Sequence, residues 1–184
     1  MAEYARINLS RSYMPAKEPA RIKNYRLAKE NYDGELPWVR IADFEKLKLK
    51  RPIVLLNGSF DLLHSGHMKV IFNARRHGKT LVVALDSDQK VAARKPGKPI
   101  CSWIERATSL GFMPVDYLVE INNDEEFVKL VNTVKPDLRV LGAEYRDKPS
   151  RIPEVPALFI HDAGVHTSEI VRRIENARSN RGNS

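Results

Sequence analysis

The stretch Asn57-Gly58-Ser59-Phe60-Asp61-Leu62-Leu63-His64-Ser65-Gly66-His67 organises the rest of this sequence. It follows a short apolar run at 53–56 and leads into a helical pattern at 66–77. A buried strand therefore ends, the chain turns through small residues, and a helix begins. Glycines let the backbone approach a ligand closely, and a helix N-terminus presents unpaired N–H groups and the positive end of its dipole. The stretch predicts a phosphate-binding site.

Apolar runs recur along the chain and alternate with helical patterns. Most of the runs are continuous, which is typical of strands that are covered on both faces. Strand–helix alternation predicts right-handed βαβ units and an α/β fold, with a Rossmann-like, doubly wound parallel sheet of about five strands. The expected strands are 53–56, 80–85, 115–119, 138–141 and 157–160, and the expected helices are 66–77, 102–112, 124–134 and 167–178.

Polar clusters follow three of these expected strands. They are the opening stretch, then Asp86-Ser87-Asp88, then Gly142-Ala143-Glu144-Tyr145. Ligands of doubly wound sheets bind beyond the carboxyl ends of the strands. We therefore expect the three clusters to meet at one edge of the sheet and to form a single site.

The charge of the chain is unevenly distributed. The 184 residues carry 31 Lys and Arg against 23 Asp and Glu, and 1–51 hold twelve of the basic and seven of the acidic ones. A basic segment attracts nucleic acid or membrane surfaces, but it equally fits a solvated arm. We expect 1–36 to be a basic extension, partly disordered or docked, followed by a short amphipathic helix at 41–47. The globular domain is expected at 37–178, with a disordered tail at 179–184.

Cysteine usage and hydropathy indicate the compartment. Cys101 is the only cysteine, which rules out an intramolecular disulfide and a cysteine metal cluster and suits a reducing environment. No apolar run reaches the length of about twenty residues that a membrane span needs. The first residues lack the apolar core of a secretory signal. We therefore expect a cytoplasmic protein without a membrane span.

His64 and His67 are three residues apart at the start of the expected helix, so they share one face. Two imidazoles there can donate hydrogen bonds to phosphate oxygens and stabilise the charge that develops on the phosphorus. A zinc site and histidines of the core are the alternatives; no other histidine has the spacing that a zinc site requires. Ser59 either offers its hydroxyl and N–H to a phosphate or is a turn residue, and Asp61 is expected to be structural.

Three further segments offer groups that bind phosphate. Lysines of the basic loop at 94–99 provide point charges, although its composition fits a solvated loop as well. Arg106, in an expected helix, either grips phosphate or pairs with a neighbouring acid. Thr167 and Ser168 precede a helical apolar run, where they form either an ordinary N-cap or a second phosphate-binding helix end.

In this order, the motifs resemble those of the cytidylyltransferase-like nucleotidyltransferases, a superfamily that shares the HxGH element. The form Phe60-Asp61-Leu62-Leu63-His64 is similar to glycerol-3-phosphate cytidylyltransferase and to the nucleotidyltransferase domain of the ADP-heptose synthesis enzyme. The likeness spans about residues 40–175. The other matching segments are 85–88, 95–99, 105–106, 140–145 and 167–170.

The resemblance implies an enzyme that moves CMP or AMP from an NTP, bound with Mg²⁺, to a phosphorylated small molecule such as a sugar or polyol phosphate, with release of pyrophosphate. It implies no protein nucleophile, and a homodimer is one assembly it suggests. We do not expect a nucleic acid partner. The implied catalytic residues are His64, His67, Lys95, Lys98 and Arg106, and the implied nucleotide-binding residues are Asn57, Gly58, Ser59, Phe60, Asp88, Gly142, Glu144, Thr167 and Ser168.

The sequence departs from the family pattern at three places. At one of them, His161-Asp162, the arginine that some cytidylyltransferases have before the last motif is absent. Ala143 stands where an acid often follows the glycine, and His166 stands where a serine is usual. In the family these positions lie near the base and ribose, so the choice between CTP and ATP stays open. The departures also motivate an alternative function, a non-catalytic nucleotide-binding or regulatory module on the same fold. The intact His64, His67 and Arg106 argue against that alternative.

Overall fold

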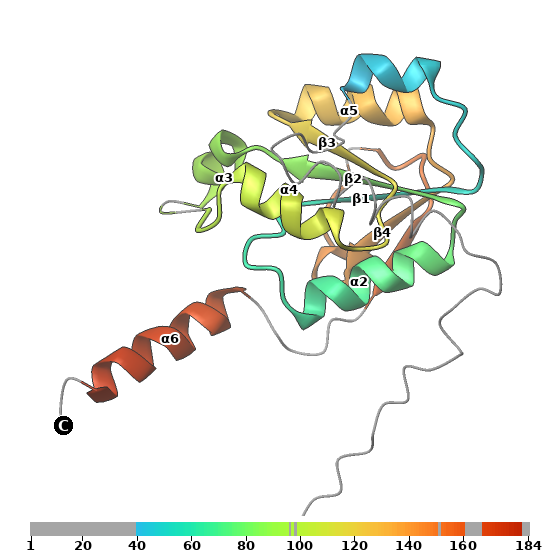
Figure 1. Ribbon diagram of the computed structural model, residues 1–184. Coiled ribbons are helices and arrows are strands. Elements are labelled where there is room, and N and C mark those ends of the chain that lie inside the picture. Colours follow the sequence, from blue (N-terminus) through green and yellow to red (C-terminus); the bar gives the residue numbers. More distant parts are fainter. Residues whose placement is uncertain (1–39, 96, 98, 151, 161–166, 182–184) are drawn as a thin grey trace, which may run out of the picture.

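The computed structural model describes residues 40–95, 97, 99–150, 152–160 and 167–181. Five strands form one parallel sheet in the order β3-β2-β1-β4-β5 (Figure 1). This arrangement confirms the predicted α/β fold. The expected extension 1–36, Lys98 and His166 lie outside the described residues. The strands are β1 (Ile53–Gly58), β2 (Thr80–Asp86), β3 (Tyr117–Ile121), β4 (Leu138–Gly142) and β5 (Ala157–Ile160).

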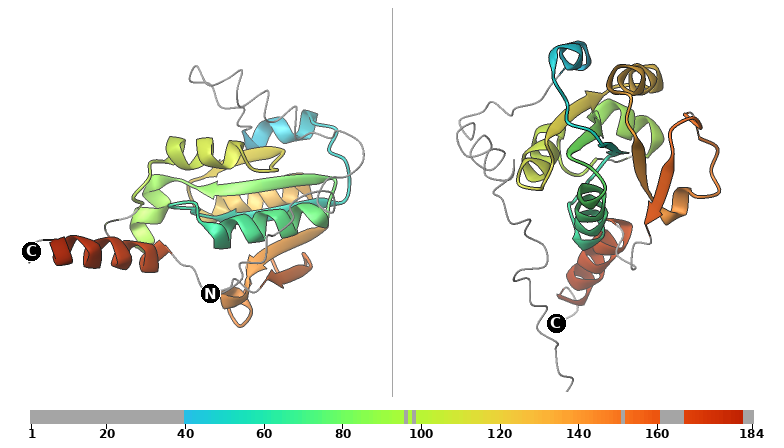
Figure 2. Two further views of the ribbon diagram at one scale, coloured as in Figure 1. Left: turned by 60° about the horizontal axis from the view of Figure 1, so that its bottom comes forward. Right: turned by 90° about the vertical axis from the view of Figure 1, so that its right-hand side faces the viewer.

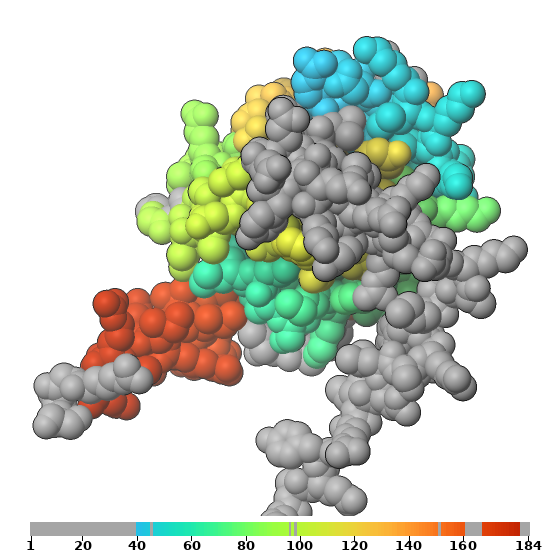
Figure 3. Space-filling view, viewed as in Figure 1, coloured from blue at the N-terminus to red at the C-terminus, as the bar shows by residue number. Residues whose placement is uncertain are grey.

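Helices lie on both faces of the sheet (Figures 1 and 2). The short helix η1 and α5 cover one face, while α2 and α4 cover the other. α6 projects away from the body as a rod, as the space-filling view also shows (Figure 3). In the described part of the chain, no helix has the length and apolar character needed to cross a membrane. The helices are η1 (Ile41–Lys46), α2 (Ser65–Arg76), α3 (Asp88–Arg94), α4 (Trp103–Gly111), α5 (Asp124–Val134), η2 (Ala143–Tyr145) and α6 (Thr167–Arg181).

β1 lies at the centre of the sheet and divides the core into two layers. Its side chains alternate, as the pleat requires. Ile53 and Leu55 pack with η1 and α5, and Val54 and Leu56 pack with α2 and α4. All four side chains are buried because helices cover both faces. This explains why the strands read as continuous apolar runs in the sequence.

The structure differs from the sequence-based expectations in a few elements. α3 was not predicted, because its seven residues are too few to show a clear periodicity. The segment expected as an amphipathic helix at 41–47 is a 3₁₀ helix. α6 continues to Arg181, although we expected the helix to end at 178 and a disordered tail to follow. β3 begins at Tyr117 rather than at 115. The preceding Asp116 accepts a hydrogen bond from the Leu81 N–H at 2.8 Å and so joins β2 from the side.

A carboxylate fixes the beginning of β1. Asp137 accepts hydrogen bonds from the Ile53 N–H at 2.6 Å and from Arg51 Nη2 at 2.6 Å. Burial alone would raise the pKa of Asp137. The hydrogen bond from Ile53 and the hydrogen bond and charge of Arg51 outweigh it, so the pKa lies below its ordinary value.

We expect Asp137→Asn to lower the stability of the protein in a pH-dependent way. Because the folded pKa is depressed, the ionised carboxylate stabilises the fold above the ordinary value of 3.8, and this contribution is lost as the pH falls through the lower folded value. In urea titrations, the free energy of unfolding should therefore be lower for the variant than for wild type at neutral pH. This difference should become smaller below pH 3.8. Glu175→Gln, at an exposed position of α6, should show no such difference. A difference that does not change with pH would contradict this assignment.

Candidate functional site

The opening stretch forms a tight turn between β1 and α2. Phe60 and Leu62 have φ angles of 47° and 48°, a left-handed conformation that is uncommon for residues with side chains. The turn is held because the Phe60 ring is buried in the core and because the Asp61 carboxylate accepts hydrogen bonds from the N–H groups of Ile100 and Cys101, each at 2.9 Å. Asp61 therefore has the structural role expected of it.

The beginning of α6 meets the same turn. The Thr167 hydroxyl donates a hydrogen bond to the Asp61 carbonyl at 2.9 Å, across 106 positions of sequence. Ser168 follows it and is exposed. The structure thus brings the last polar cluster of the sequence to the first.

The two histidines stand side by side at the N-terminus of α2. Their rings are stacked, with centroids 3.8 Å apart and an angle of 25° between the planes. The His67 ring also lies 5.3 Å from the Phe60 ring. His64 is the N-cap of α2, and its Nδ1 accepts a hydrogen bond from the Gly66 N–H at 3.1 Å. A neutral imidazole with Nδ1 as acceptor carries its proton on Nε2, so His64 has a donor on the opposite side of its ring.

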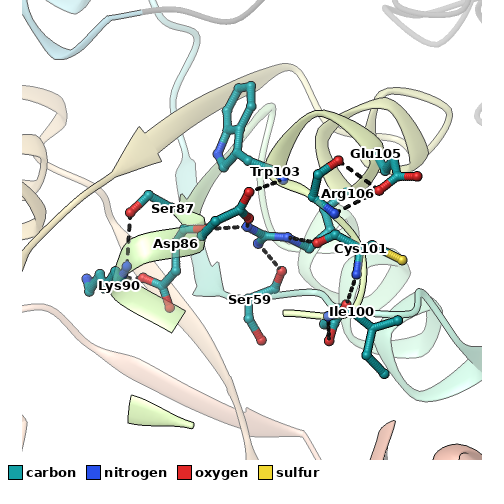
Figure 4. A network of polar contacts seen from close by, with 12 residues as sticks. Ser59, Asp86, Ser87, Lys90, Ile100, Cys101, Trp103, Glu105 and Arg106 are labelled. Carbon is teal, nitrogen blue, oxygen red and sulfur yellow. Dashed lines mark hydrogen bonds and ion pairs between the residues drawn. The ribbon is translucent and has the colours of Figure 1, made fainter. Parts of the chain in front are cut away.

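Arg106 lies inside the protein rather than at its surface (Figure 4). Its side chain is 0% exposed and donates to the carbonyls of Ser59, Asp86 and Cys101 and to the Asp88 carboxylate. This geometry differs from the expectation that Arg106 grips a phosphate, because four of its five N–H groups are already used. Of the two alternatives, pairing with an acid fits, and the acid is Asp88.

Asp88 is likewise engaged by the protein. Its Oδ1 accepts from Arg106 at 2.6 Å and its Oδ2 from the Trp103 N–H at 2.9 Å. The carboxylate therefore joins the start of α3 to the start of α4. Within α4, Ser102 donates its N–H and its hydroxyl to Glu105, which fixes the first turn of that helix.

The expected basic loop begins where α3 ends. Lys95 is the C-cap of α3 and is exposed. Gly97 has a φ of +74°, and a Cβ there would meet nothing within 4 Å. The loop therefore stands clear of the body at that point. Lys98 cannot be placed, since it lies outside the described residues.

We call the rim the edge of the sheet formed by residues 57–67, 86–95 and 142–145. Asn57 is exposed there, and Gly58 and Ser59 are half-buried. As expected, the three polar clusters meet at this edge, because the parallel strands β1, β2 and β4 all end there. Among the described residues, no group of three His, Cys, Asp or Glu side chains is placed to hold a metal.

The segment after β4 forms the other side of the rim. The Glu144 carboxylate folds back over Gly142 and occupies the space that a Cβ would need there. Burial raises the pKa of Tyr145, and the charge of Glu144 raises it further; Arg94 acts in the opposite direction and Asp86 in the same one. The charges of Arg94 in α3 and Asp86 in β2 therefore reach Tyr145 of η2.

Sequence reasoning placed Asp86 at the rim but did not predict its ion pairs. Asp86 is 6% exposed, and its carboxylate pairs with Lys90 and Arg94 of α3. The available signal was Ser87, whose hydroxyl accepts a hydrogen bond from the Lys90 N–H and caps α3. A serine that follows a strand and precedes an acid is a helix start, and the two cations then fall one turn apart on the same face.

Comparison with known proteins gives three findings. A family model described as cytidylyltransferase-like matches residues 55–175. The chain is 39% identical over 157 residues to the bifunctional protein HldE of Campylobacter concisus, a match that covers 81% of the chain and 33% of the relative. With HldE of Helicobacter pylori strain J99 it is 36% identical over 146 residues, or 74% of the chain and 31% of the relative. The chain thus spans about a third of the length of these relatives.

A solved structure is also similar. The lipopolysaccharide core biosynthesis protein of Thermoplasma volcanium has a TM-score of 0.50 and 27% identity, and the match covers 61% of this chain and 98% of that one.

Replacement of Arg106 tests whether its role is internal. We expect Arg106→Met to destabilise the fold by about 3–5 kcal/mol, because it leaves buried carbonyls and the Asp88 carboxylate without their donor. Arg106→Lys keeps the charge but loses the planar guanidinium, so its stability should lie between that of Arg106→Met and that of wild type. Arg173→Met, at an exposed ion pair of α6, should cost about 0–1 kcal/mol in the same urea titrations. A fully stable Arg106→Met would show that the network does not hold the rim together.

Proposed function

The chain belongs to the cytidylyltransferase-like family of nucleotidyltransferases, and we propose that it transfers CMP or AMP from an NTP to the phosphate of a sugar or polyol phosphate. The acceptor oxygen attacks the α-phosphorus, the bond from that phosphorus to the bridging oxygen breaks, and pyrophosphate leaves with the electron pair. The catalytic domain is proposed at 37–178. Similarity to a protein named for lipopolysaccharide core biosynthesis supports a sugar phosphate as the acceptor. A reducing, NTP-containing cytoplasm suits the reaction.

The observation that carries this proposal is the pair of stacked histidines at the N-terminus of α2. The Nε2–H of His64 and the imidazole of His67 donate to oxygens of the α-phosphate. Negative charge grows on those oxygens as the fifth bond to phosphorus forms, so donors fixed in advance stabilise the transition state more than the ground state. The dipole of α2 acts in the same direction. The scheme needs no protein nucleophile.

The rest of the rim holds the nucleotide in this proposal. Backbone N–H groups of the turn after β1 and the first residues of α6 contact phosphates, and the loop lysines neutralise the leaving pyrophosphate. Gly142 and Glu144 face the nucleoside. Arg106 and Asp88 are positioning residues, because they fix the carbonyl of Ser59 and the starts of two helices. The nucleotide-contacting set is Asn57, Gly58, Ser59, Phe60, Thr167 and Ser168, and the lysines are Lys95 and Lys98.

Mg²⁺ enters as part of the substrate. The ion keeps most of its ligands as phosphate oxygens and water in sites of this kind. The carboxylates of the rim are consistent with an ion that is held mainly by phosphate and water. Asp61, Asp86 and Asp88 are already engaged by N–H groups or cations, so the arrangement does not require them as ligands. Bound in this way, Mg²⁺ would withdraw charge from the triphosphate.

The proposal is tested by supplying ATP or CTP with Mg²⁺ and a panel of sugar and polyol phosphates, and by measuring released pyrophosphate. At least one pair should react. We expect His64→Asn to lower turnover about 100-fold or more, because the imidazole donor is lost. Asparagine keeps an N-cap oxygen for the Gly66 N–H, so the melting temperature should hardly change.

His77→Asn, at the exposed C-cap of the same helix, is the matched control and should keep full turnover. Unchanged turnover in His64→Asn would move the reaction centre away from α2. Nucleotide binding without pyrophosphate release from any pair would favour the non-catalytic module.

A further inference from the structure

Asp86 is a buried carboxylate that two cations of α3 hold from one side. It lies at the carboxyl end of β2, and its side chain is 8% exposed. Lys90 Nζ is 3.1 Å from Oδ1, and Arg94 Nη2 is 2.5 Å from Oδ2. Lys90 is itself mostly buried and also reaches Asp124 of α5 at 3.4 Å. The lysine therefore pairs with one buried carboxylate, Asp86, and with one partly exposed carboxylate, Asp124.

Arg94 is placed differently from its neighbour. Its side chain is 55% exposed although its partner is buried. Beyond the bond to Asp86, it makes one long hydrogen bond, from Nε to the Lys90 carbonyl at 3.4 Å. No acceptor among the described residues lies within hydrogen-bond distance of its Nη1. Asp86 thus fixes one end of the guanidinium, and more than half of the Arg94 side chain is open to solvent.

The position of Arg94 is opposite to that of the histidines. Along β2, Ala84 packs in the layer with α5 and Leu85 in the layer with α2, so the alternation puts Asp86 on the α5 side. The Phe60 ring that His67 contacts belongs to the α2 side. Arg94 and the histidines therefore flank the end of β1 from the two faces of the sheet.

The proposed reaction brings together two anionic substrates. Transfer of a nucleotide to a phosphate requires the acceptor oxygen to approach the α-phosphorus from the side opposite to the leaving pyrophosphate, so the two phosphate groups need separate cationic centres. The histidines and α2 supply one centre. An arginine whose fork is fixed at one end is suited to bind a phosphate with its remaining N–H groups.

We propose that Arg94, held in place by Asp86, binds the phosphate group of the acceptor, an inference that rests on the proposed function. Tyr145 of η2, which follows β4, is also part of the rim and is 48% exposed. Asp86 acts only as a positioning residue. It would take no part in contacts with the substrate.

Steady-state kinetics of Arg94→Gln test this inference with the NTP and acceptor pair that reacts in the panel. We expect the KM for the acceptor to rise about tenfold or more, because a charge-assisted hydrogen bond to phosphate is lost. The KM for the NTP should stay within about twofold, since the histidines and α2 bind the triphosphate separately. Arg94→Lys should recover part of the affinity, and Asp86→Asn should raise the acceptor KM because the guanidinium is no longer held.

Arg40→Gln is the matched control, because Arg40 forms an exposed ion pair with Asp43 at 2.8 Å outside the rim. It should leave both KM values unchanged. A rise in the KM for the NTP alone would overturn the inference, and so would unchanged constants in Arg94→Gln.

A second measurement separates this inference from the proposed function. Inorganic phosphate titrated into the full chain should shift the NMR signal of the Arg94 side-chain Nε–H, and it should do so less in Asp86→Asn. This readout does not require turnover. Absence of pyrophosphate release from every pair would sink the proposed function, whereas an Arg94 signal that does not respond to phosphate would sink this inference.

Discussion

The rim depends on the buried guanidinium of Arg106. Strand ends and turns leave carbonyls without partners, and a buried carbonyl without a donor costs free energy. Arg106 supplies donors to the carbonyls of Ser59, Asp86 and Cys101, which belong to three different connections of the chain. One planar group with several fixed N–H directions can do this, whereas a lysine cannot. The turn, the end of β2 and the start of α4 are therefore held relative to one another by one side chain.

The charges of the rim are also arranged by contacts within the protein. Its three aspartates are each satisfied within the protein: Asp61 by two N–H groups, Asp88 by Arg106 and one N–H, and Asp86 by Lys90 and Arg94. The negative charges of these three aspartates are thus neutralised where they stand, whereas Glu144 is exposed. Arg94 and Lys95 are exposed as well, and such positive groups suit a surface that binds phosphates.

The sequence predicted the fold well because the sheet is covered on both faces. Buried parallel strands are continuous apolar runs, and all five were located to within a few residues. The histidine pair was also predictable, since their spacing on a helix fixes their relation. Arg106 was not, because a sequence cannot tell whether an arginine in an amphipathic helix faces solvent or the interior. The pairing of Asp86 with Arg94 was missed for a related reason. It depends on α3, a helix of seven residues that is too short to show a period.

Gly142 has a consequence for how variation in this chain is interpreted. The Glu144 carboxylate occupies the volume beside the Gly142 Cα, and that carboxylate is the end of a long, exposed side chain. An alanine at 142 would therefore displace the acid rather than disrupt the strand. The exchange of one apolar residue for another would then relocate a negative charge at the part of the rim that follows β4. Positions 142 and 144 are therefore coupled, and replacing Gly142 by alanine would change the electrostatic potential of the rim without any change in formal charge.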